Sequence, residues 1–145
     1  MNSRISRRIA AAAALVTFAA GVGAATSIDT RPVAPKTVEV QMIGDATGYK
    51  FSPAKVTIAR GDKVKFTLVS GPPHNVVFWE DSIPKGAAAK LGKAMTKTVG
   101  PLTGPFLLNP KDSYEISFAG LPAGKYGFYC APHLALGMRG VIEVK

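Results

Sequence analysis

The C-terminal part of the chain holds three side chains whose types and spacing suit metal chemistry. Cys130 is the only cysteine in the chain, His133 follows it by three positions, and Met138 follows His133 by five. A thiolate, an imidazole and a thioether are soft or borderline metal ligands, and one loop can present all three to one point. The competing interpretation is structural, because free cysteines and methionines are common residues of hydrophobic cores.

His74 supplies the second imidazole, since the chain has only two histidines. It lies directly before the apolar run Asn75–Trp79, where a histidine without partners would more often be structural. One cysteine, two histidines and one methionine form the ligand set of a trigonal blue-copper site with a long axial thioether. We therefore predict that His74, Cys130, His133 and Met138 bind one copper ion.

Short apolar or alternating stretches predict the strands that must position these ligands. The stretches are residues 37–43, 55–59, 63–69, 75–79, 113–118, 125–130 and 139–145. Turn-forming residues separate them, and Gly61 in one such turn can adopt a positive φ. The continuous run 75–79 predicts a strand that is covered on both faces. Seven or eight short strands at this spacing predict an all-β fold, either an antiparallel β-sandwich or a barrel.

Residues 84–106 interrupt the strand pattern. Alanines and lysines follow Pro84 and predict a short helix of one or two turns that ends by residue 95. Residues 96–106 are rich in glycine and proline and predict an irregular loop.

The first 25 residues are typical of an export signal. Arg4, Arg7 and Arg8 precede an alanine-rich apolar stretch, and the small residues that end at Ala25 form a cleavage site. This stretch is short for a membrane span, so we favour cleavage over the alternative of a retained anchor. The Arg7-Arg8 pair is compatible with twin-arginine export as well as with general secretion.

We therefore divide the chain into a signal peptide (1–25), a flexible, proline-containing lead (26–36) and one domain (37–145). A chain of 145 residues with 47% hydrophobic and 19% charged side chains suits a single globular domain. Export would place this domain in the periplasm, or in the thylakoid lumen if the host is photosynthetic.

The mature chain is basic. Without residues 1–25 it carries 15 basic and 9 acidic side chains, a net charge of +6. This charge favours acidic protein partners through long-range steering, although a basic surface that only maintains solubility carries equal weight. The lysines are spread singly along the chain, which argues against a nucleic-acid partner. We expect at most peripheral membrane contact, and a monomer.

Two segments resemble a known family. PHNVVF (73–78) and YGFYCAPHLALGMRG (126–140) are similar to the cupredoxins, and among them most closely to the plastocyanins. The Cys-x2-His-x4-Met spacing is the plastocyanin one, and the resemblance covers most of residues 37–145. It implies an eight-stranded Greek-key β-sandwich that binds one copper ion and shuttles single electrons. It also implies that Asn75 ties the two ligand loops together, and that Tyr129 lies near a remote partner-docking area.

We predict an exported type 1 copper protein that shuttles single electrons between redox proteins. We do not expect an enzyme, because copper oxidases and nitrite reductases need further histidines and both histidines are already assigned. The alternative is a periplasmic copper storage or delivery protein, although such proteins use exposed, exchangeable sites. A sandwich without metal would leave the pattern of four ligands unexplained.

The electron is expected to pass through His133, as the ligand that lies on the outer loop. Pro72, Leu134 and Leu136 would form an apolar docking patch for a transient partner around it. The partner would be an acidic or neutral redox protein, such as a cytochrome or a terminal oxidase domain. Trp79 is expected to pack in the core or at a strand edge.

Overall fold

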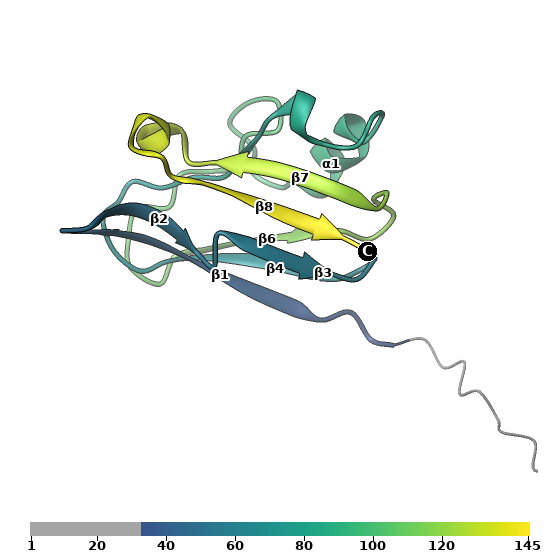
Figure 1. Ribbon diagram of the computed structural model, residues 1–145, viewed down its shortest axis with the longest axis horizontal. Helices are drawn as coiled ribbons and strands as arrows, with labels where there is room; N and C mark the ends of the chain where they lie inside the picture. The colour runs from purple at the N-terminus through teal and green to yellow at the C-terminus, as the bar shows by residue number, and fades with distance from the viewer. Residues whose placement is uncertain (1–32) are drawn as a thin grey trace, which may run out of the picture. The chain divides into compact units, whose positions relative to one another are not determined.

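The computed structural model describes residues 33–145, which form two facing four-stranded β-sheets (Figure 1). The signal peptide predicted for residues 1–25, and residues 26–32 of the predicted lead, lie outside the described residues. Between residues 33 and 145, no helix is long and apolar enough to cross a bilayer.

Each sheet draws its strands from distant parts of the chain. The first sheet has the order β2 (Gly48–Ser52), β1 (Thr37–Asp45), β4 (Lys63–Leu68) and β6 (Ser113–Ser117). The second has the order β3 (Lys55–Ile58), β8 (Arg139–Val144), β7 (Gly124–Tyr129) and β5 (Val77–Phe78). The predicted all-β sandwich with eight strands is therefore confirmed.

The sheets are mixed, whereas the sequence predicted antiparallel pairing. Strand β1 runs parallel to β4, and β3 runs parallel to β8, while the remaining neighbours are antiparallel. The physical reason is that the chain crosses from one sheet to the other between β2 and β3, so that sequence neighbours are not always sheet neighbours. An alternating pattern identifies the buried face of a strand and carries no information on strand direction.

Alternating apolar residues place the core between the sheets. In β4, Val64, Phe66 and Leu68 are buried and the residues between them are partly exposed, as period-2 alternation requires. The ring of Phe66 lies 5.3 Å from that of Phe128 in β7, and Phe51 lies 4.8 Å from the same ring. Burying side chains of this size contributes about 1.5–3 kcal/mol each, so this aromatic cluster holds the two sheets together.

Two strands differ from their predictions. Strand β2 was not predicted, because it is only five residues long and directly follows the polar turn at the end of β1. Residues 75–78 are buried as expected and Trp79 is partly exposed, but only Val77 and Phe78 pair as a strand. His74 and Val77 instead form isolated bridges with Leu107 and Thr103, so a loop takes the place of a neighbouring strand.

The region 84–106 has the predicted character. It contains one short helix, α1 (Ala88–Ala94), whose Leu91 is buried, and an irregular loop over 96–106. The predicted turn before β4 is also present, and Gly61 adopts a φ of 93° there.

The loop that carries Cys130 and His133 lies at one end of the sandwich. It forms a 3-10 turn, η2 (Ala131–Leu136), between β7 and β8, and appears at the left of Figure 1.

Candidate metal centre

The turn η2 closes on itself through backbone hydrogen bonds between the predicted ligands. The His133 amide donates to the Cys130 carbonyl at 3.2 Å, and the Met138 amide donates to the His133 carbonyl at 3.2 Å. The Cys130 amide in turn donates to the Met138 carbonyl at 3.1 Å. The backbone at all three positions is therefore fixed by the loop itself, before any metal binds.

Gly137 lets the chain reverse between His133 and Met138. Its φ of 84° is left-handed, and its amide donates to the Leu134 carbonyl at 2.9 Å. A non-glycine residue pays a conformational penalty at such a φ, so glycine ends the turn and brings Met138 back toward β8. Met138 is completely buried there.

His74 enters the site from the segment before β5. Its backbone pairs with Leu107, with N···O distances of 3.1 and 2.7 Å, which fixes the segment against the loop after α1. The Nε2 atom of His74 lies 2.9 Å from the Ser70 carbonyl oxygen. Because a carbonyl only accepts, Nε2 carries the proton and Nδ1 is left with a free lone pair. This tautomer suits a metal ligand that coordinates through Nδ1.

The three nitrogen and sulfur donors converge in the interior. The Sγ atom of Cys130 lies 3.5 Å from Nδ1 of His74 and 3.5 Å from Nδ1 of His133. Across the three residues, the donor atoms lie within 4.8 Å of one another. One thiolate and two imidazoles in a buried cluster, with a thioether-bearing methionine on the same loop, fit the donor chemistry of copper.

Burial sets the protonation of these groups. It raises the pKa of the Cys130 thiol, and the backbone N–H groups of Asn75 and His133 offset part of that rise. It lowers the pKa of the His74 imidazole, and the Ser70 carbonyl opposes part of that shift. It also lowers the pKa of His133, with a smaller contribution from His74 beside it. Both shifts favour the neutral imidazole, which is the state that binds a metal.

Asn75 connects the two ligand-bearing segments. Its Oδ1 accepts the backbone N–H of Ala131 at 2.8 Å, so the residue after His74 is bonded to the residue after Cys130. Asn75 is 1% exposed, so water has little access to this bond. The tie between the two loops that the resemblance implied is present in the structure.

The surroundings of His133 differ in part from the prediction. His133 is the more accessible of the two histidines, but at 8% exposure it is nearly buried. The reason is Tyr49, whose ring stacks on the imidazole with centroids 3.7 Å apart and an interplanar angle of 11°. Sequence reasoning missed Tyr49 because it missed β2. The only signal was the alternation of Tyr49 and Phe51 after Gly48.

The three residues of the predicted apolar patch all reach the surface. Leu136 is 61% exposed, Pro72 is exposed, and Leu134 is partly exposed. Single exposed apolar residues are ordinary, so the docking patch itself stays a prediction.

Tyr129 and Trp79 form a second aromatic feature beside Cys130. Their rings stack with centroids 4.5 Å apart and an interplanar angle of 29°, and both are partly exposed. Trp79 thus packs at a strand edge, as the sequence predicted.

These features together define a cupredoxin-like protein. It is a β-sandwich whose paired loops bury one cysteine and two histidines at one end, with a methionine closing the second loop.

Comparison with known proteins agrees with this class. The family described as "Copper binding proteins, plastocyanin/azurin family" matches residues 38–145. The minor chloroplastic plastocyanin of Arabidopsis thaliana is 41% identical over 110 residues, which cover 74% of this chain and 58% of that protein. A plastocyanin of Synechococcus sp. is 36% identical over 122 residues, which cover 84% of this chain and 83% of that protein.

A solved structure has the same fold. The oxidised plastocyanin of Dryopteris crassirhizoma superposes with a TM-score of 0.56 at 31% identity, covering 74% of this chain and 100% of that one. The chain belongs to the plastocyanin/azurin family of copper-binding proteins. It is a blue copper protein that binds one copper ion and carries electrons between redox proteins, and it is not an enzyme.

Proposed function

We propose that His74, Cys130, His133 and Met138 hold the copper ion of this electron carrier. The observation that carries the assignment is the buried convergence of one thiol and two imidazoles, with donor atoms within 4.8 Å of one another. Met138 is the fourth ligand because it is buried and is hydrogen-bonded through its backbone to both Cys130 and His133.

Bound copper supplies a one-electron couple between Cu(I) and Cu(II). The protein's part is to offer donors that suit both states, since thiolate and thioether sulfur favour Cu(I) and imidazoles accept either. The Ser70 carbonyl holds the His74 ring, and the Asn75 carboxamide holds the Cys130 loop. Because these contacts are internal to the fold, the donors need not move when the electron arrives or leaves.

The electron leaves or enters through the apolar end of the sandwich. His133 is the most accessible of the three converging ligands, and Leu136 beside it is 61% exposed. A small apolar surface gives a short-lived complex, which suits a carrier that must release each partner quickly.

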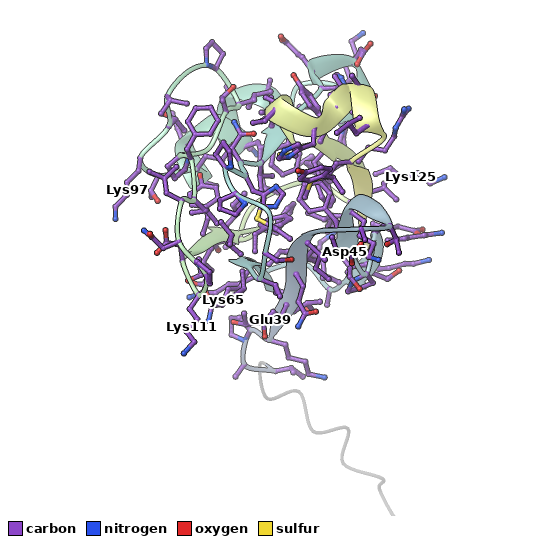
Figure 2. All side chains as sticks on the ribbon, turned by 90° about the vertical axis from the view of Figure 1, so that its left-hand side faces the viewer. Glu39, Asp45, Lys65, Lys97, Lys111 and Lys125 are labelled. Atoms are coloured by element: carbon purple, nitrogen blue, oxygen red, sulfur yellow. The ribbon has the colours of Figure 1, made fainter. Side chains whose placement is uncertain are left out.

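Charge selects the partner in this proposal. Residues 82–111 contain five lysines and no acidic residue, and all five lysines are exposed. Figure 2 looks onto the end that carries η2, with Lys97 and Lys111 on one side of this view. Exposed lysines beside an apolar surface favour an acidic or neutral redox protein, such as a cytochrome or a terminal oxidase domain. The carrier acts as a monomer.

The protein acts outside the cytoplasm, and the periplasm is the compartment we propose. Support comes from the export signal in residues 1–25, which is followed by the lead 26–36 and the domain 37–145. A thylakoid lumen is the corresponding compartment if the host is photosynthetic.

A storage or delivery protein is not favoured. Such proteins need donors that are accessible from solvent, so that the copper ion can exchange readily. Cys130 and His74 are completely buried here. The relatives found by comparison are plastocyanins.

A redox titration of the copper-loaded protein tests the carrier function. We expect one reversible one-electron couple per chain, with the visible absorption lost on reduction and regained on oxidation. Copper that dissociates on reduction, or the absence of a reversible couple, would contradict the proposal.

A further inference from the structure

The ring of Tyr49 covers one face of His133. Their centroids are 3.7 Å apart and the planes differ by only 11°, which is a close parallel stack. The same tyrosine meets His74 edge-on, with centroids 6.0 Å apart at 67°. One side chain from the edge strand β2 therefore contacts both imidazoles of the candidate site.

The strand opposite Tyr49 is built to admit this ring. Tyr49 pairs with Gly44 of β1. A Cβ atom at Gly44 would lie 2.5 Å from Cε1 of Tyr49 and 3.0 Å from the Cα of Gly71. Real Cβ atoms essentially never approach so closely, so any larger residue at Gly44 would push the ring away.

The same hairpin is bonded to the segment that carries His74. The Gly44 amide donates to the Ser70 carbonyl at 2.9 Å, and the Ser70 hydroxyl donates to the Gly44 carbonyl at 2.9 Å. The Ser70 carbonyl also accepts from Nε2 of His74 at 2.9 Å. The β1–β2 hairpin thus fixes His74 through Ser70 and contacts His133 through Tyr49.

His133 needs such support more than His74 does. Its backbone departs from helical geometry within η2, with φ of −119° and ψ of 15°, and its imidazole lies near the surface of the loop. An imidazole turns easily about its terminal torsion, for which the rotamer preference is broad. A ring stacked against its face restricts this rotation and keeps Nδ1 directed at Cys130.

We propose that Tyr49 is a positioning residue for the His133 ligand. Through the face of its ring it holds the imidazole plane in the orientation that places Nδ1 3.5 Å from Sγ of Cys130, before metal binds and afterwards. This role rests on the proposed function of His133 as a copper ligand. It depends on the aromatic ring and not on the hydroxyl group.

The first test needs no metal. The full mature chain is prepared as wild type, Tyr49→Phe and Tyr49→Leu, and the His133 ring protons are observed by NMR in the metal-free proteins. The wild type and Tyr49→Phe should give one sharp set of His133 ring signals, shifted upfield by the stacked ring. Tyr49→Leu should move these signals downfield and broaden them. Unchanged His133 signals in Tyr49→Leu would overturn the proposal.

The second test uses Zn(II), which binds without redox chemistry, in competition with a chelator. Because an aromatic pair is worth about 0.5–1.5 kcal/mol, Tyr49→Leu should bind Zn(II) about 2- to 12-fold more weakly than Tyr49→Phe. Gly44→Ala keeps the tyrosine but displaces its ring, so it should weaken binding in the same direction. Equal affinities of Tyr49→Leu and Tyr49→Phe would overturn the proposal.

The two tests separate this inference from the proposed function. If the wild type binds no metal, the ligand assignment fails, yet the metal-free NMR still decides whether Tyr49 orients His133. Thermal unfolding of the metal-free variants checks the fold of each one. A loss of stability in Tyr49→Leu with unchanged His133 signals would show that the ring is only packing, and would also overturn the proposal.

Discussion

His74 uses its two ring nitrogens for different purposes. Nε2 is bonded to the Ser70 carbonyl at 2.9 Å, while Nδ1 faces Sγ of Cys130 at 3.5 Å. The first contact selects the tautomer, and the second places the remaining lone pair at the site. A histidine with this division of roles acts as a donor without having to lose a proton first.

The axial ligand can be tested through the reduction potential. Met138→Gln replaces a thioether with an oxygen donor, which stabilises Cu(II) relative to Cu(I), so the potential should fall. Each tenfold relative gain in Cu(II) binding lowers a one-electron potential by about 59 mV. Spectroelectrochemistry on the copper-loaded protein measures the shift.

Met95→Leu is the matched control for that substitution. Met95 is buried at the end of α1, outside the ligand loop, and a Met-to-Leu exchange roughly conserves volume. Its potential should equal that of the wild type. If Met138→Gln leaves the potential unchanged or raises it, Met138 is not the axial ligand.

At the residue scale, the sequence was sufficient to propose the four ligands, but it did not predict that Tyr49 stacks on one of them. Cys130, His133 and Met138 lie close together in the sequence, so their spacing alone indicated a shared loop. Tyr49 lies more than 80 positions before His133. The stack between them depends on the packing of β2 against η2, which no local pattern reports.

At the scale of elements, two loops form the site and Asn75 joins them. Removing the carboxamide by Asn75→Ala leaves the Ala131 N–H without its acceptor in this partly buried hydrogen bond. Losing an intramolecular hydrogen bond costs about 0.5–1.5 kcal/mol, so the free energy of unfolding of the metal-free protein should fall by that amount. Urea denaturation measures it.

Asn109→Ala is the control for this prediction. Asn109 also makes a hydrogen bond within a loop, because its Nδ2 donates to Asp112 at 3.3 Å, but this bond is exposed to solvent. Its replacement should change the free energy of unfolding by no more than about 0.5 kcal/mol. Equal effects of the two substitutions would mean that the Asn75 tie contributes nothing of its own.

The turn between β3 and β4 makes stability depend on pH. The Asp62 carboxylate accepts the backbone N–H of Lys36 at 2.8 Å and of Ala59 at 2.9 Å. The Lys36 bond, followed by the Ala59 bond, lowers the pKa of Asp62 below its usual value. Its stabilising contribution is therefore complete above the unfolded-state pKa and is lost as pH falls through the lower folded-state pKa.

Asp62→Asn should consequently destabilise the protein at neutral pH and flatten the acid limb of its stability profile. The wild type and the variant should converge in stability at the lowest pH. The measurement is the free energy of unfolding of the metal-free protein as a function of pH. Asp81→Asn, at an exposed carboxylate, should follow the wild type. If the free energy of unfolding of Asp62→Asn depends on pH in the same way as that of the wild type, Asp62 is not the source of this pH dependence.

The sequence predicted strands best where apolar and polar residues alternate along the whole strand. Strands β4 and β6 alternate along their whole length and were predicted within a residue or two. Strand β5 pairs with β7 on one side and with Thr103 of a loop on the other, so its pairing is shorter than its apolar run. Burial and strand pairing are separate properties, and apolar residues report only burial.

At the scale of the whole molecule, all-β class followed from composition and strand spacing. The order of strands in each sheet could not be predicted in this way, because the parallel pairs β1–β4 and β3–β8 join strands that are separated along the chain. The ligand end of the sandwich carries the exposed Leu136, and Figure 2 shows Lys97 and Lys111 on one side of the same view. In the proposed docking, charge governs the encounter with a partner, and the apolar surface governs the bound state.

Electron transfer to an acidic cytochrome should therefore slow as salt rises. The Debye length falls from about 30 Å at 0.01 M to about 10 Å at 0.1 M, which shortens the reach of opposite charges. Leu136→Asp should slow transfer further at every salt concentration, by roughly tenfold if the lost contact is worth about 1.4 kcal/mol. Stopped-flow measurements give both rates.

Val33→Asp is the matched control, since it adds the same charge at an exposed valine near the start of β1, away from η2. It should retain the wild-type rate more closely than Leu136→Asp does. A transfer rate that rises with ionic strength, or that is the same in Leu136→Asp as in the wild type, would contradict this docking surface. Neither result would affect the assignment of the copper site.

The central claim is that Cys130 binds copper as a thiolate together with His74, His133 and Met138. The most direct measurement is the visible absorption spectrum of the purified protein titrated with Cu(II), for the wild type and for Cys130→Ala. The account predicts an intense blue or green band from sulfur-to-copper charge transfer that saturates at one copper per chain, and no such band in Cys130→Ala. A band that is unchanged in Cys130→Ala would contradict it.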